Sequence, residues 1–87
     1  MAVKQAKYLS YTVVFEPAEE GGYIVRVPAL EGCVTQGDNL EEARTMARDA
    51  IEGYLAVLQE EGLPIPEDID SKPVYEKIKV AMPAGSA

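Results

Sequence analysis

Residues 22–43 decide the fold, and they read GYIVRVPALEGCVTQGDNLEEA. Tyr23–Val27 is a short run of β-branched and aromatic residues, which is typical of a strand. Pro28 cannot donate a hydrogen bond to a sheet and therefore ends that strand, and Cys33–Gln36 is a second short run that follows a turn. At Gly37 the pattern changes from that of a strand to that of a helix.

A long helix is expected from Leu40 to about Glu61. Its N-cap is predicted to be Asn39, with Glu42 three residues later as the second half of a capping box, although Asp38 with Glu41 is an alternative. At 100° per residue the apolar side chains of this segment form one stripe. The stripe comprises Leu40, Ala43, Ala47, Ala50, Ile51, Tyr54, Leu55 and Leu58.

The chain on either side of these residues supplies two more predicted strands. Tyr8–Phe15 (YLSYTVVF) contains neither glycine nor proline and should pair with Tyr23–Val27 through a hairpin loop at residues 16–22. Val74–Val80 (VYEKIKV) places its lysines on one face, which suits a last strand at or near a sheet edge. Between the helix and this strand, Leu63–Ser71 alternates prolines with acids, which indicates an extended connector.

The order β-β-β-α-β predicts a protein of the α+β class, a two-layer sandwich in which one long helix covers one face of a small, mostly antiparallel sheet. Its 87 residues are enough for a single domain, with a core at about residues 7–80 and a flexible tail at residues 81–87. One cysteine and no histidine allow neither an intrachain disulfide nor a zinc cluster of the usual kind. Self-association is therefore the expected way to add buried surface.

The sheet face that the helix leaves uncovered is predicted to be partly apolar. Tyr8, Val14 and Ile24 have the opposite parity to the strand residues that would face the helix. Monomers also expose scattered apolar side chains. We nevertheless expect these three residues to form the contact surface of a homo-oligomer, either a dimer or a tetramer.

The charge balance limits the classes of partner. Fifteen acids against eight bases give a net charge of −7, which disfavours direct contact with nucleic acid or anionic lipid and favours a basic partner. No apolar run is long enough to cross a membrane, and residues 1–7 lack the features of a signal peptide. A cytoplasmic protein without a cofactor is therefore expected.

Two groups of acids could be mistaken for a metal site. They are Glu16, Glu19 and Glu20, and Asp38, Glu41 and Glu42. They could converge on a divalent ion, as in nucleases that use two ions, but turn solvation and helix capping already account for them, and no acid lies in the middle of a predicted strand. Cys33 has no histidine to activate it and is expected to be a small core residue. We therefore expect neither a metal site nor a catalytic residue.

Taken together, residues 22–43 resemble the signature of the HicB-like antitoxin family. The matching features are a Gly-aromatic strand, a Pro-x-x-x-Gly-Cys turn at residues 28–33, a short strand closed by Gly37, and a helix opened by a polar cap and Glu-Glu-Ala. Residues 11–15 and 62–66 also fit, so the resemblance covers roughly residues 7–80. Asn39 stands where the family usually has serine or threonine.

The resemblance implies a partial ribonuclease-H-like fold that lacks the catalytic acids of that enzyme. Members of the family bind a small basic toxin that cleaves messenger RNA, HicA, and mask its catalytic histidine, and they commonly assemble as dimers or tetramers. Many also carry a C-terminal DNA-binding module, whereas this chain stops soon after Val80. We therefore expect a stand-alone domain of the N-terminal type that does not contact nucleic acid by itself.

The sequence thus predicts a non-enzymatic antitoxin of a type II toxin–antitoxin system, with a HicA-type toxin as its partner. Two alternatives stay open, namely an orphan oligomeric structural or binding module whose toxin has been lost, and a metal-dependent nuclease on the same frame. A neighbouring reading frame for a short basic protein with a histidine would favour the antitoxin. The predicted docking patch for the toxin comprises Glu19, Glu20, Asp38, Glu41 and Glu42.

Overall fold

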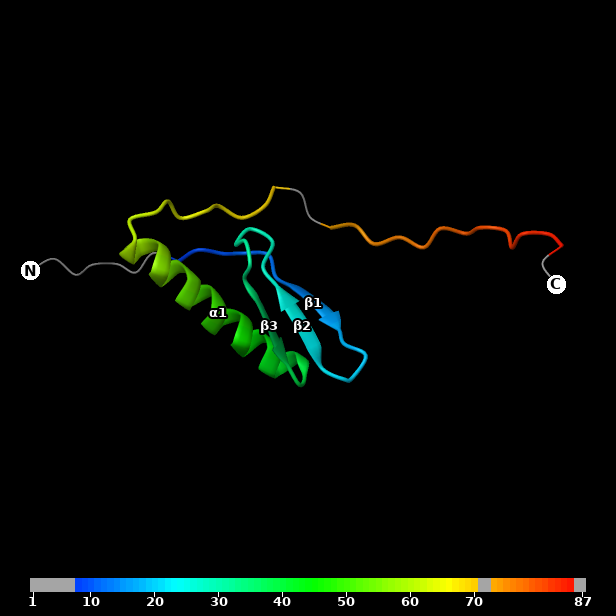
Figure 1. The fold of residues 1–87 in the computed structure, drawn as a ribbon, viewed down its shortest axis with the longest axis horizontal. Coiled ribbons are helices and arrows are strands. Elements are labelled where there is room, and N and C mark those ends of the chain that lie inside the picture. Colours follow the sequence, from blue (N-terminus) through cyan, green and yellow to red (C-terminus); the bar gives the residue numbers. More distant parts are fainter. Residues whose placement is uncertain (1–7, 71–72, 86–87) are drawn as a thin grey trace, which may run out of the picture.

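The three strands and the helix of this protein form two layers (Figure 1). A computed structural model describes residues 8–70 and 73–85. The strands make one antiparallel sheet in the order β1-β2-β3, and the helix lies across one face of it, so the predicted α+β arrangement is confirmed. The elements are β1 (Val14–Pro17), β2 (Tyr23–Arg26), β3 (Val34–Gly37) and α1 (Leu40–Glu60).

Helix α1 begins at the predicted residue and ends one residue before the predicted end. The Asn39 side chain is the N-cap, because its Oδ1 accepts a hydrogen bond of 2.8 Å from the backbone N–H of Glu42. The alternative cap, Asp38, is thereby excluded. At the other end Gly62 follows the C-cap Glu61 with a φ of 67°, a left-handed conformation that favours glycine.

The predicted apolar stripe of α1 faces the sheet and is buried or half-buried along its whole length. Val25 of β2 packs against Ala43 and Ala47, and these small side chains let the helix lie close to the strand. A second cluster contains Val27, Leu30 and Cys33 from the turn between β2 and β3. Outside the helix, the half-buried side chains that pack on these clusters are Tyr11, Val13, Phe15 and Tyr23.

Strand β3 and helix α1 come closest at Gly37. A Cβ atom on Gly37 would lie 2.5 Å from the backbone nitrogen of Ala43, a separation that real Cβ atoms essentially never show. Gly22, which has a φ of 76°, is equally restricted, because a Cβ atom there would lie 2.5 Å from the carbonyl oxygen of Gly37. Any side chain at these two positions would push the hairpin, the sheet and the helix apart.

Two of the predicted strands differ from the structure. Residues 8–13 are extended but pair with no strand of the described chain, so β1 begins at Val14 rather than at Tyr8. Residues 73–80 are also extended, but they lie away from the sheet and form no fourth strand within the described residues (Figure 1). The physical reason is the same for both, since side-chain alternation favours an extended backbone but a strand also needs a second backbone beside it.

Replacing the helix cap should cost measurable stability. Asn39→Ala is expected to lower the free energy of unfolding by about 0.5–2 kcal/mol, because the Glu42 N–H loses its acceptor. Asp38→Ala removes the neighbouring residue, which does not cap, and should change stability by less than about 0.5 kcal/mol. Urea unfolding followed by circular dichroism measures both variants, and equal losses would contradict the assignment of the cap.

A glycine pair provides a second test of the fold. Gly37→Ala is expected to destabilise the protein by about 1–3 kcal/mol or more, since the new methyl group overlaps the backbone of Ala43. Gly53→Ala is the matched control, because nothing lies within 4 Å of a Cβ atom at this exposed helical position. The control should raise stability by roughly 0.5–1 kcal/mol in the same urea titration. A Gly37→Ala protein as stable as the wild type would show that the helix is seated differently.

Candidate partner-binding site

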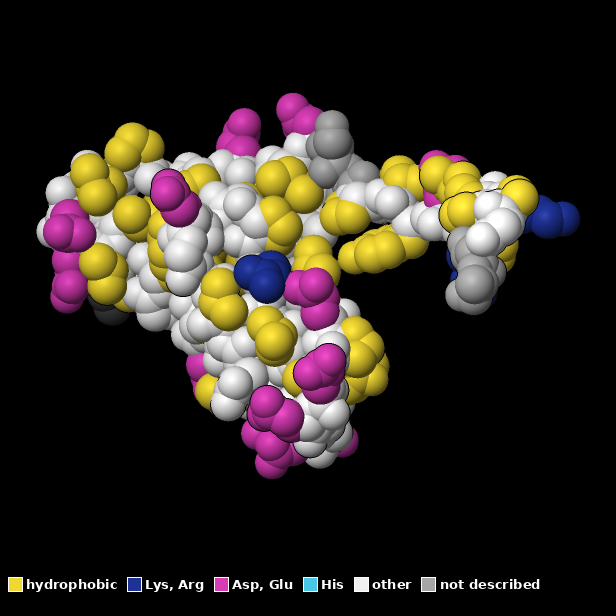
Figure 2. Space-filling model, turned by 45° about the vertical axis from the view of Figure 1, so that its right-hand side comes forward, with side chains coloured by type: hydrophobic (Ala, Val, Ile, Leu, Met, Phe, Trp, Pro, Cys, Tyr) yellow, Lys and Arg dark blue, Asp and Glu magenta, His cyan; other side chains and the backbone are white. Residues whose placement is uncertain are grey.

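The hairpin between β1 and β2 and the start of α1 lie at the same end of the molecule. Tyr23 pairs with Gly37, and a Cβ atom on Gly22 would lie 3.2 Å from the Cα of Asp38. The structure therefore brings together two groups of acids that are separate in the sequence. Figure 2 shows acidic side chains gathered at the lower tip of the molecule. The five predicted docking residues, Glu19, Glu20, Asp38, Glu41 and Glu42, are all exposed, and we call this surface the acidic end.

The folded body, residues 8–70, carries more net negative charge than the whole chain. Residues 8–70 contain fourteen acids and three bases, a net charge of −11, and the two terminal segments add four positive charges to give −7. One of the three bases, Arg26, is paired through its Nε with Oε1 of Glu16 at 2.6 Å. The five carboxylates of the acidic end make no ion pair within residues 8–70 and 73–85. This end is thus able to pair with the basic groups of another molecule.

The grouping of the same acids in the described residues bears on the metal-site alternative. In the part of the chain that the structure describes, no three histidine, cysteine, aspartate or glutamate residues are grouped so that they could hold a metal ion. A divalent ion requires several oxygen ligands that converge on one point. The arrangement therefore gives no support to a metal-dependent nuclease.

Cys33 is a core residue, as predicted. Its side chain is 7% exposed and packs with Val27 and Leu30, and its carbonyl oxygen accepts a hydrogen bond of 3.1 Å from the backbone N–H of Val27. Burial raises the pKa of the Cys33 thiol, so the nucleophilic thiolate is disfavoured. The backbone of Cys33 closes the turn between β2 and β3, and its side chain belongs to the core.

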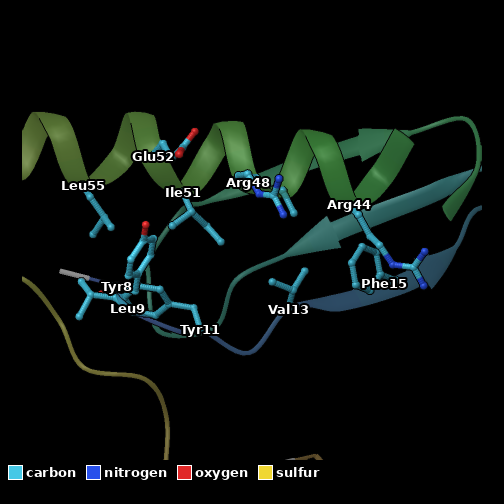
Figure 3. A pocket seen from close by; sticks show the side chains of 11 residues that line it. Tyr8, Leu9, Tyr11, Val13, Phe15, Arg44, Arg48, Ile51, Glu52 and Leu55 are labelled. Carbon is cyan, nitrogen blue, oxygen red and sulfur yellow. The ribbon is translucent and has the colours of Figure 1, made fainter. Parts of the chain in front are cut away.

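A groove of about 840 Å³, which the sequence did not predict, lies between β1 and α1 (Figure 3). Helix α1 packs mainly on β3 and β2, and so it leaves the inner side of β1 partly uncovered. The helix contributes Ile51 and Leu55, together with the charged side chains of Arg44, Arg48 and Glu52. The strand side of the groove is lined by Tyr8, Leu9, Tyr11, Val13 and Phe15.

The structure separates the three predicted oligomer-contact residues. Val14 and Ile24 share the outer face of the sheet, because Val14 pairs with Arg26 and Ile24 pairs with Glu16. Tyr8 instead lines the groove on the helix side. Since residues 8–13 are not part of a strand, the alternation counted back from Val14 does not fix the direction of Tyr8. A contact between copies through Val14 and Ile24 stays a prediction.

The chemistry of Cys33 can be tested directly. Iodoacetamide is expected to alkylate the folded chain at least about tenfold more slowly than the urea-unfolded chain, because the thiol is buried and its pKa is raised. The pKa is higher in the folded state, so the stability that the neutral thiol contributes is present below its ordinary value of 9.0 and is lost as the pH rises through the folded value. Cys33→Ala should remove that alkaline loss. Mass spectrometry measures the alkylation, and equal rates would contradict burial of the thiol.

Several known proteins are similar to this chain in sequence. The family described as "HicB_like antitoxin of bacterial toxin-antitoxin system" matches residues 11–83. A UPF0150 protein of Thermoplasma acidophilum is 42% identical over 60 residues, which are 69% of this chain and 87% of that protein. A UPF0150 protein of Synechocystis is 41% identical over 75 residues, or 85% of this chain and 95% of that protein. Antitoxin HicB 1 of Photorhabdus laumondii is 51% identical over 45 residues, which are 52% of this chain but 29% of that protein.

Within residues 8–70 and 73–85, no helix is both long enough and apolar enough to cross a membrane. The match to the antitoxin family covers most of the two-layer body, including the hairpin and the helix start that form the acidic end. This chain belongs to the HicB-like antitoxin family.

Proposed function

We propose that this protein is the antitoxin of a type II toxin–antitoxin pair, and that it neutralises a small basic toxin of the HicA type, which cleaves messenger RNA, by binding it. Membership of the HicB-like family supports the antitoxin role. The main support for the binding step is the acidic end. It presents five exposed carboxylates from two segments, on a body with a net charge of −11 over residues 8–70.

Charge explains how binding would also inhibit. A ribonuclease holds the anionic RNA backbone with lysine and arginine side chains. Carboxylates that pair with those side chains compete directly with RNA for the same surface. The body also carries a field that speeds encounter with a basic partner and disfavours an acidic one. Inhibition of this kind requires no reacting group in the antitoxin.

Three finer points belong to the same proposal. The protein acts without catalysis, on a frame that resembles part of ribonuclease H. It meets its partner in the cytoplasm, where messenger RNA is translated. It works as a homo-oligomer, so that several copies of the acidic end are displayed together.

Purification from the native host tests the role. The tagged chain should co-purify a short basic protein with a histidine, encoded by a neighbouring reading frame and identified by mass spectrometry. Co-expression of the two should restore growth to cells that the partner alone arrests. A clean homo-oligomer, together with growth arrest that the chain does not relieve, would favour the orphan binding module instead.

The acidic end can be tested by neutralising it. Glu19→Gln, Glu20→Gln, Glu41→Gln and Glu42→Gln together should slow association with the toxin and reduce its dependence on salt, because charges near the contact set the encounter rate. The matched control removes four exposed acids elsewhere, and both variants carry a net charge of −3. Biolayer interferometry over a range of salt concentrations compares them. Equal association rates would place the contact outside the acidic end. The control substitutions are Glu31→Gln, Glu60→Gln, Glu61→Gln and Glu67→Gln.

A further inference from the structure

Residues 73–83, which we call the C-terminal arm, leave the body as an extended segment (Figure 1). Their alternation places Val74, Ile78 and Val80 on one face and the lysines on the other. Each of these apolar side chains is about four-fifths exposed, as are Tyr75 and Met82. A contiguous set of exposed apolar residues with a strand pattern marks a segment that is covered by another surface when it functions.

The body of the protein offers a surface of matching shape. Strand β1 is the first strand of the sheet, and no strand of the described chain pairs with its outer edge. The apolar groove opens beside this edge, between β1 and α1 (Figure 3). The strand side of the groove runs from Tyr8 to Phe15. Thr12 is bonded to Asp68 of its own chain, so the edge that a second segment can pair with is that of β1, about 13 Å long. An unpaired strand edge next to apolar side chains is the usual site for adding an extended segment.

We propose that the arm of a second copy of this chain pairs with the free edge of β1 and lays its Val74–Ile78–Val80 face over the groove. The exchange is reciprocal, so each copy both gives an arm and receives one, and the assembly closes as a symmetric dimer. The proposal rests on the homo-oligomer part of the proposed function, for which it names the contact, and not on the toxin.

The distribution of charge favours the arm of a second copy as the segment that pairs with β1. The described part of the arm carries Lys77 and Lys79 against Glu76, a net charge of +1, whereas residues 8–70 carry −11. The acid Glu76 has the same parity as the apolar residues of the arm. The groove contains two arginines, Arg44 and Arg48, against one acid, Glu52, and the arginines make no ion pair within the described chain. The lysines on the other face of the arm would offset the repulsion between two acidic bodies.

The path of the connector favours a second copy over the same chain. The hydroxyl of Tyr11 donates a hydrogen bond of 2.6 Å to the carbonyl oxygen of Pro66. The backbone N–H and the hydroxyl of Thr12 donate to the two carboxylate oxygens of Asp68, at 2.9 and 2.7 Å. These bonds fix the connector at the start of the groove, and beyond them the arm leads away from its own body (Figures 1 and 2).

Photo-cross-linking of a mixed population tests the exchange. Full-length chains with benzoylphenylalanine at Tyr75 are unfolded and refolded together with isotopically heavy chains that lack the probe. Tyr75 lies on the face opposite Ile78, so the probe does not replace an apolar contact with the groove. We expect the probe to join to residues 8–17 of heavy chains. Links confined to the probe's own light chain, or the absence of links to this region, would overturn the proposal.

A substitution in the arm gives an independent readout. Ile78→Asn should lower the assembly mass from at least twice the 9.4 kDa of one chain and weaken association by roughly 10- to 100-fold per arm, because a buried isoleucine is lost. Tyr75→Asn, the same new residue on the face opposite Ile78, should leave the mass unchanged. Circular dichroism confirms that the helix is intact in both. A monomeric wild-type chain, or an assembly that Ile78→Asn does not weaken in sedimentation equilibrium, would overturn the exchange while leaving the toxin proposal standing.

Discussion

The contact between Gly37 and the backbone of Ala43 sets the position of the only helix in the described chain. With no side chain between them, the end of β3 and the first turn of α1 touch, and the helix runs from there over β3 and β2. This placement buries Val25 under Ala43 and Ala47 and leaves β1 half covered, which creates the groove. The same contact holds the hairpin against the helix start and so assembles the acidic end. The groove and the acidic end therefore both depend on the absence of a side chain at Gly37.

The helix could be predicted almost completely from the sequence, because its determinants are local. The Asn39 cap, the apolar stripe and Gly62 all act within a turn or two of the residues they affect. The strands were predicted less well because each depends on a neighbour elsewhere in the chain. β2 could be placed within a residue, since it has partners on both sides, whereas residues 8–13 and 73–80 have a strand pattern but no partner strand within the described chain.

The candidate site was only partly visible in the sequence. Turn and cap positions correctly predicted that the five acids are exposed, but their union at one end depends on the packing of Gly22 against Gly37. The net charge of −7 also conceals how strongly charge is segregated between the body and the terminal segments. The groove could not be foreseen, because it depends on where a straight helix lies over a twisted sheet rather than on any pattern of residues.

Helix α1 separates the acidic end, at its N-terminus, from the connector that Tyr11 and Thr12 hold beyond its C-terminus. Its 21 residues span about 32 Å, several times the distance of about 8 Å over which physiological salt screens charge. A charge bound near the connector therefore has little direct electrostatic effect at the acidic end, which keeps its attraction for a basic partner.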